Sequence, residues 1–138
     1  MEINIKSIPH NDMRFSQIGE GGIGDWWDEN GATQIRVSEM DVWIYKRLIA
    51  IHELIEDTLV KLAGIDGKWY DQWCDKEGIL LADEMKNPIA KQHETATICE
   101  RIVAQAAGVD FRVYEDYIEW FIKNQKGNAE RPQPADAD

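Results

Sequence analysis

The sequence is poor in cysteine, and it lacks both a long apolar run and the features of a leader peptide. The two cysteines, Cys74 and Cys99, form no CxxC pair, so we expect reduced thiols that pack as small apolar residues. No apolar stretch approaches the length that crosses a bilayer, which excludes a membrane partner. The N-terminus lacks the basic and apolar regions of a signal peptide, so the sequence predicts a cytoplasmic protein.

Basic residues are also scarce relative to acidic ones. The chain has 15 Lys and Arg against 26 Asp and Glu, a formal net charge of −11. This charge repels a phosphate backbone, so direct nucleic-acid binding is not expected. Two interpretations of the acidic surface remain open. It keeps the protein in solution, or it imitates nucleic acid toward a basic partner, as some phage inhibitors do.

The length of 138 residues is that of one ordinary domain with a hydrophobic core of its own. Residues 1–124 are predicted to form this domain, and residues 125–138, rich in Pro, Ala and Asp, to form a disordered acidic tail. Six tryptophans are expected to anchor the core and the loops rather than to form a binding surface. They are Trp26, Trp27, Trp43, Trp69, Trp73 and Trp120.

The first third of the chain has the patterns of short β-strands. Residues 2–8 alternate isoleucine with polar neighbours, which indicates a strand. Glu29-Asn30-Gly31 separates two further strands, at 26–28 and 33–37, and favours a β-hairpin. The glycine-rich loop at 19–24 lacks the strand-to-helix context and the basic charge of a phosphate-binding loop, so it is interpreted as a flexible loop.

Helices are predicted in the remainder of the chain. Ser38, Asn87 and Asp110 are expected to begin the three long ones, and Gly64 and Gly108 to end the first two. The predicted ranges are 38–63, 88–107 and 111–123, with a short helix expected at 68–76. The fold class is therefore α+β, with a small, mainly antiparallel N-terminal sheet packed on three C-terminal helices.

Residues 51–56 read Ile-His-Glu-Leu-Ile-Glu and contain an HExxE box. His52 and Glu56 lie one helical turn apart on the same side, so both can reach one metal ion, with Glu53 beside them as a candidate general base. Their neighbours on this face are mostly apolar, and an ionisable pair there costs free energy unless it is hydrogen-bonded, ion-paired or metal-bound.

The next long helix repeats this arrangement. His93 and Glu100 interrupt a stripe that is otherwise apolar, formed by Ile89, Ala96, Val103 and Ala107. Two helices that each carry His and Glu in an apolar stripe can converge on one site. Metal binding is the favoured interpretation, and the alternative is a structural network in which these groups bridge the helices without a metal.

The chain resembles zincin-type metallopeptidases in this box and in the order of its elements. A small sheet with an edge-like strand at 34–37 is followed by the helix that carries His52-Glu53. The chain is also similar, over roughly residues 2–115, to a family of small, largely uncharacterised phage and prophage proteins built around a HELIE helix. A phage origin implies the cytoplasm of the host cell.

The zincin resemblance implies roles for individual residues. His52 is the first ligand, Glu53 activates a water, and Glu56 replaces the usual second histidine. His93 is the third ligand, and Glu100 completes the shell or orients His93 through its other ring nitrogen. Zinc is the implied metal, and the carboxylate of Glu56 moves the preference toward iron or manganese. The presence of Glu56 in place of a second histidine weakens the expectation of proteolysis more than the expectation of metal binding.

The sequence thus predicts a zincin-like metal-binding protein, and a metal-dependent hydrolase of the peptidase kind is the activity that the zincin resemblance would imply for it. The alternative from another class is a non-catalytic acidic phage accessory protein or inhibitor that binds a host protein. A weaker alternative is a magnesium-dependent nucleotide pyrophosphatase that uses Glu53, Glu56, Asp83 and Glu84, but the N-terminal strands do not suit its all-α architecture. The third histidine, His10, is expected to be exposed in a loop.

Overall fold

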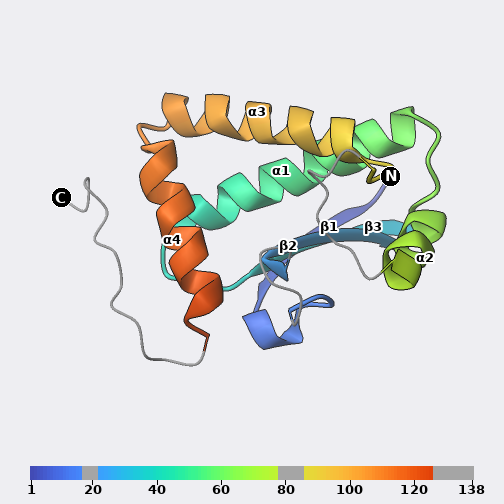
Figure 1. Cartoon of the computed structure of the whole chain (residues 1–138), viewed down its shortest axis with the longest axis horizontal. Helices are drawn as coiled ribbons and strands as arrows, with labels where there is room; N and C mark the ends of the chain where they lie inside the picture. The colour runs from blue at the N-terminus through green and yellow to red at the C-terminus, as the bar shows by residue number, and fades with distance from the viewer. Residues whose placement is uncertain (17–21, 78–85, 126–138) are drawn as a thin grey trace.

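The computed structural model describes residues 1–16, 22–77 and 86–125 (Figure 1). The predicted α+β class is confirmed, while nearly all of the predicted tail lies outside the described residues. The strands are β1 (Ile3–Ile8), β2 (Gly24–Glu29) and β3 (Ala32–Ser38), with a 3-10 turn, η1, at His10–Asp12. The helices are α1 (Trp43–Leu62), α2 (Gly67–Glu77), α3 (Ala90–Ala106) and α4 (Phe111–Lys123).

The sheet is mixed, so the prediction of a mainly antiparallel sheet is wrong. The strand order is β1-β3-β2, in which β1 runs parallel and β2 antiparallel to β3. The hairpin places β2 on one edge of β3, and the long segment between Ile8 and Gly24 lets β1 pair with the other edge. The strand predicted as edge-like, at residues 34–37, is therefore in the centre of the sheet.

Several predicted turns and helix ends are confirmed. Asn30 and Gly31 have φ of 55° and 77°, the left-handed conformation that a two-residue hairpin turn favours. α1 and α3 end just before Gly64 and Gly108, each with φ of 74°. The carboxylate of Asp110 caps α4 by accepting hydrogen bonds from the first-turn backbone.

Two predicted helix starts are wrong. Ser38 is the last residue of β3, and α1 begins five residues later with Val42 as its N-cap. α3 begins at Ala90, because Asn87 instead accepts a hydrogen bond from the backbone N–H of Ile89 at 2.9 Å and closes a local turn. The residues that favour helix N-caps also favour turns, so the sequence pattern did not distinguish the two uses.

The helices form two layers on one face of the sheet. α1 lies between the sheet and α3, and α3 runs antiparallel along α1, with α4 at one end and α2 at the other (Figure 1). One apolar cluster contains Tyr45, Leu48 and Tyr114, and a second contains Trp26 and Val60. The HExxE box lies on α1 between the residues of these two clusters.

Not every apolar residue is buried as predicted. Leu62, an apolar residue of the first predicted helix, is exposed at the end of α1. Trp26 is buried, whereas Trp43 and Trp69 are largely exposed, so the expectation that the tryptophans anchor the interior holds only for part of the set. Both cysteines are free thiols. Within the described ranges, we find no helix with the length and apolarity needed to cross a membrane.

Candidate metal centre

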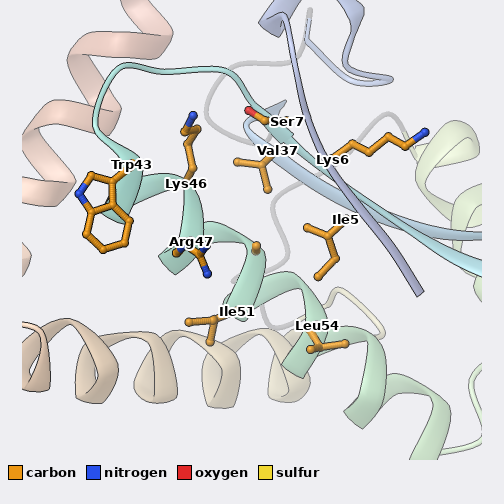
Figure 2. A pocket seen from close by; sticks show the side chains of 10 residues that line it. Ile5, Lys6, Ser7, Val37, Trp43, Lys46, Arg47, Ile51 and Leu54 are labelled. Carbon is orange, nitrogen blue, oxygen red and sulfur yellow. The ribbon is translucent and has the colours of Figure 1, made fainter. Parts of the chain in front are cut away.

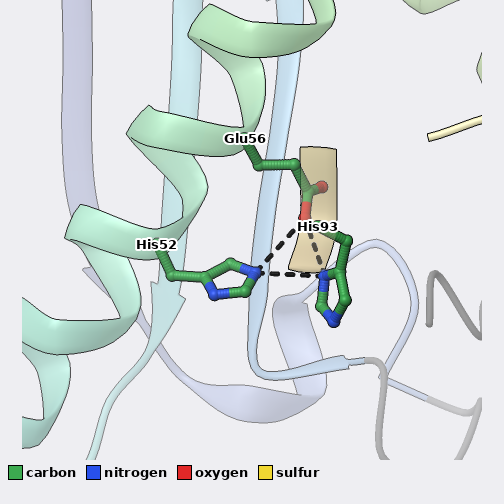
Figure 3. A group of neighbouring side chains, drawn as sticks. All are labelled: His52, Glu56 and His93. Carbon is green, nitrogen blue, oxygen red and sulfur yellow. Dashed lines mark hydrogen bonds and ion pairs between the residues drawn. The ribbon is translucent and has the colours of Figure 1, made fainter. Parts of the chain in front are cut away.

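Three side chains from two helices bring one donor atom each to a common point (Figure 3). His52 and Glu56 extend from successive turns of α1, and His93 extends from the first turn of α3. Nδ1 of His93 lies 2.8 Å from Oε2 of Glu56. Nε2 of His52 lies 3.2 Å from both of these atoms. The structure thus brings together the three residues predicted as ligands.

These distances suit a first-row divalent ion. Zinc lies about 2.0–2.1 Å from imidazole nitrogen and carboxylate oxygen, and a point at that distance from all three atoms lies roughly 1 Å off their plane. Two imidazoles and one carboxylate form a donor set used by catalytic zinc and by non-haem iron. Three protein ligands also leave a coordination position open.

The cluster is buried except at one edge. His52 and Glu56 are buried, whereas the side chain of His93 is 28% exposed. Solvent, an ion or a substrate group therefore has access from the side of His93. The burial of His52 and Glu56 strengthens the electrostatic interactions between these groups.

Each predicted ligand on α1 is held by a partner at its other polar atom. Nδ1 of His52 lies 2.8 Å from Oε1 of Glu100. The Glu100 carboxylate also accepts a hydrogen bond from the side chain of Tyr114. Oε1 of Glu56 accepts a hydrogen bond of 3.0 Å from the indole N–H of Trp26 on β2. Such outer partners orient a ligand and select its tautomer, which is typical of metal sites.

The role predicted for Glu100 needs correction. Its carboxylate contacts His52, not His93, and it lies at the ring atom that faces away from the cluster. The reason is the antiparallel packing of α1 and α3, which places Glu100 opposite His52 and places His93 opposite Glu56. Sequence reasoning missed Trp26 and Tyr114 as partners, because no spacing rule links them to the HExxE box.

The neighbouring carboxylates set the charge of His52. Burial acts to lower the pKa of His52, but its hydrogen bonds to Glu100 and Glu56 raise the pKa to about 10. Burial acts to raise the pKa of Glu56, but its hydrogen bonds to His52 and His93 lower the pKa to about 2. Without a metal, the site is therefore an imidazolium between two carboxylates, and a metal ion must displace a proton from His52.

The carboxylate of Glu53 lies against Gly24 of β2, within the range of the charges of Glu56 and His52. A Cβ on Gly24 of β2 would lie 2.5 Å from Oε1 of Glu53 and 2.7 Å from Cγ2 of Ile49, so a larger residue at this position would displace the carboxylate. Burial, followed by the charge of Glu56, raises the pKa of Glu53 well above its ordinary value. A raised pKa suits a general base, and a nearby cation would oppose the rise. The catalytic role of Glu53 stays a prediction.

The third histidine is not exposed as predicted. His10 is buried in η1, with Nδ1 at 2.8 Å from Oγ of Ser38 and its ring against Phe121. The end of β3 covers this loop, which the sequence pattern did not indicate. Asp83 and Glu84, named for the pyrophosphatase alternative, lie outside the described residues, as do residues 19–21 of the glycine-rich loop.

Comparisons with protein-family models, curated proteins and solved structures found no match to the chain. The resemblances to zincins and to small phage proteins therefore stay predictions. The interpretation of the site depends on the geometry of its own residues.

The charges of this site predict a pH dependence for the metal-free protein. The pKa of His52 is about 10 in the folded protein, above the ordinary value of 6.5 that applies in the unfolded chain. The stabilisation that His52 provides is therefore complete below pH 6.5 and is lost as the pH rises toward 10. The pKa of Glu56 is about 2 in the folded protein, below the ordinary value of 4.5 that applies in the unfolded chain. The stabilisation that Glu56 provides is therefore complete above pH 4.5 and is lost as the pH falls toward 2. Melting in excess chelator should show maximal stability between these limits and a fall of roughly 5–10 °C by pH 9.

A His52→Gln variant serves as the control, because it should lose most of the alkaline decrease in melting temperature. The raised pKa of Glu53 adds to the decrease, since folding favours its protonated form and this advantage disappears at high pH. A melting temperature that stays constant from pH 6 to pH 10 would contradict the assigned charges.

Proposed function

We propose that this protein binds one divalent metal ion through His52, Glu56 and His93 and acts as a metal-dependent hydrolase. Zinc is the favoured ion, and iron or manganese are the alternatives that the carboxylate ligand admits. The observation that carries the proposal is the convergence of three donor atoms within 2.8–3.2 Å of one another, from two helices.

The short distance between the two ring nitrogens favours a metal over a proton-only network. Nε2 of His52 and Nδ1 of His93 lie 3.2 Å apart and both approach the same oxygen of Glu56. If both nitrogens carry protons, their two N–H groups share one acceptor, Oε2 of Glu56. The two donors then lie only 3.2 Å apart and repel each other. A divalent cation with neutral imidazoles instead balances Glu56 and Glu100 and satisfies all three atoms.

The surroundings support a reactive rather than a purely structural ion. Three protein ligands leave room for an exogenous group, and the exposed edge at His93 provides access. A bound ion would act as a Lewis acid on water or on a carbonyl group. Glu53, with its raised pKa, is the residue we propose as the base that activates a water for attack on a peptide bond.

Metal content is the direct test. Protein purified without a histidine tag should contain about one equivalent of metal, and removal of that metal by a chelator should lower the melting temperature. Binding at a thousandfold excess over Kd stabilises the folded state by about 4 kcal/mol, which corresponds to roughly 10 °C for a chain of this size. Elemental analysis and differential scanning fluorimetry measure the two effects.

Two histidine variants provide the matched comparison. His93→Ala removes a predicted ligand and should abolish the metal-dependent shift, whereas His10→Gln removes a histidine of another site and should keep it. If zinc, iron and manganese all leave the melting temperature of the wild-type protein unchanged, the proposal is wrong. A metal-free protein that binds a basic host factor tightly would instead support the accessory-protein alternative.

A further inference from the structure

A groove follows the side of α1 that faces away from the metal centre (Figure 2). Its volume is about 760 Å³, and its apolar floor is formed by Ile5, Val37, Ala50, Ile51 and Leu54. Ala50 and Leu54 each lie two residues from a metal ligand of α1, which is about 200° around the helix. The groove is therefore a surface separate from the metal centre.

The groove has a positive charge in an acidic protein. Of the ten residues that line it, three are basic, namely Lys6, Lys46 and Arg47, and none is acidic. The chain as a whole has 26 acidic and 15 basic residues. Glu39 compensates the charge of Lys46 through an ion pair of 2.8 Å, and its other oxygen accepts a hydrogen bond from Ser7, so the positive charge of the lining comes from Lys6 and Arg47. Arg47 lies over the ring of Trp43. The charge of this surface favours an acidic ligand.

The outer edge of β1 borders the groove and offers unpaired backbone groups. Among the described strands, β1 pairs with β3 alone. The backbone carbonyls of Glu2 and Ile8 accept hydrogen bonds from the direction of β3. Because strand residues alternate, the backbone N–H and C=O groups of Ile3, Ile5 and Ser7 face the opposite edge. A strand edge of this kind is a template for pairing with another chain.

Apolar side chains are exposed at the same place. Ile5 is 52% exposed and Trp43 is 66% exposed, although both contribute to the lining of the groove. An apolar floor beside a free strand edge matches the requirements of strand addition, in which backbone hydrogen bonds provide affinity and alternate side chains enter pockets.

We propose that this groove binds an extended acidic segment of a partner protein, which adds as a strand to the free edge of β1. Alternate apolar side chains of the segment contact Ile5 and Leu54, and the acidic side chains between them point to the opposite face of the sheet, on the side of Lys6. A lipid with an anionic head group is a poorer occupant, because its acyl chain has no backbone groups that could pair with the strand edge. A second copy of this chain would bring together two net charges of −11, which opposes association.

A labelled peptide tests this proposal. The probe is a fluorescein-labelled peptide that alternates aspartate with valine and isoleucine, and its anisotropy should rise saturably as protein is added. A peptide with lysine in place of aspartate should bind at least about tenfold more weakly, because it brings like charge toward Lys6 and Arg47. A peptide N-methylated at alternate residues, on the edge that pairs with β1, should also bind about tenfold more weakly, because it lacks donors for the strand edge.

Variants of the groove have matched controls elsewhere on the surface. Ile5→Asp and Arg47→Glu should each weaken binding of the acidic peptide about tenfold, whereas Leu62→Asp and Lys91→Glu, exposed residues outside the groove, should not. Thermal melts check that each variant is folded.

Three outcomes would overturn the proposal. The first is absence of saturable binding by the acidic peptide, and the second is equal affinity for the N-methylated and parent peptides. The third is a concentration-dependent dimer of the wild-type protein that Ile5→Asp dissociates, because that result assigns the groove to a second copy of the chain. Metal content does not enter this test, so its result is independent of the proposed hydrolase function.

Discussion

His52→Ala should remove the metal and destabilise the protein, whereas Glu53→Gln should retain both the metal and the fold and lose only hydrolysis. His52 contributes a donor atom and separates two buried carboxylates, so its loss leaves Glu56 and Glu100 without their shared partner. Removing one member of a buried ion pair typically costs about 3–5 kcal/mol, in addition to the lost metal binding.

Glu53→Gln should have the opposite effect on stability. Burial and the charge of Glu56 favour the protonated form of Glu53, and glutamine resembles that neutral form in size and shape. The melting temperature should therefore be unchanged or slightly raised at alkaline pH. Without an ionisable carboxyl, however, the variant has no base at this position, and hydrolysis should fall by about 100-fold or more.

Elemental analysis, thermal melts and release of label from casein measure the three properties in both variants. Equal loss of metal in His52→Ala and Glu53→Gln would mean that Glu53 is a ligand. Wild-type hydrolysis by Glu53→Gln would exclude it as the base while leaving the metal assignment intact.

Glu56→His should retain zinc and shift hydrolysis toward lower pH. It replaces the carboxylate by a neutral ligand and restores the HExxH spacing, so the effective positive charge on the ion rises. A more positive ion makes water more acidic and a better nucleophile near neutral pH. The pH–rate profile of the variant and its zinc stoichiometry measure these two effects.

The structure adds a cost to this exchange. One oxygen of Glu56 accepts a hydrogen bond from the indole N–H of Trp26, and the other oxygen lies near both histidines. An imidazole at this position cannot make both sets of contacts. The metal-free variant should therefore lose about 1–3 kcal/mol of stability.

Glu56→Gln is the matched control, because its amide can keep the contact with Trp26 while removing the charge. It should bind zinc more weakly than either the wild-type protein or Glu56→His. A Glu56→His protein that is destabilised and takes up no zinc would support the purely structural network of histidines and glutamates.

The sequence alone determined the local features of this chain. The spacing of His52 and Glu56 on α1, and of His93 and Glu100 on α3, follows from helical periodicity, which acts within one or two turns. The left-handed turn at Asn30-Gly31 is equally local, because it depends on the backbone conformations that those residues tolerate. Such features were predictable without knowledge of any distant contact.

Only the tertiary structure decided how these elements meet. Antiparallel packing of α1 on α3 assigns Glu100 to His52, and the packing of α1 on the sheet brings Trp26 of β2 to Glu56. Neither pairing has a signal in sequence spacing. Contacts between distant segments depend on which apolar faces pack together, and that choice is made by the whole core rather than by neighbouring residues.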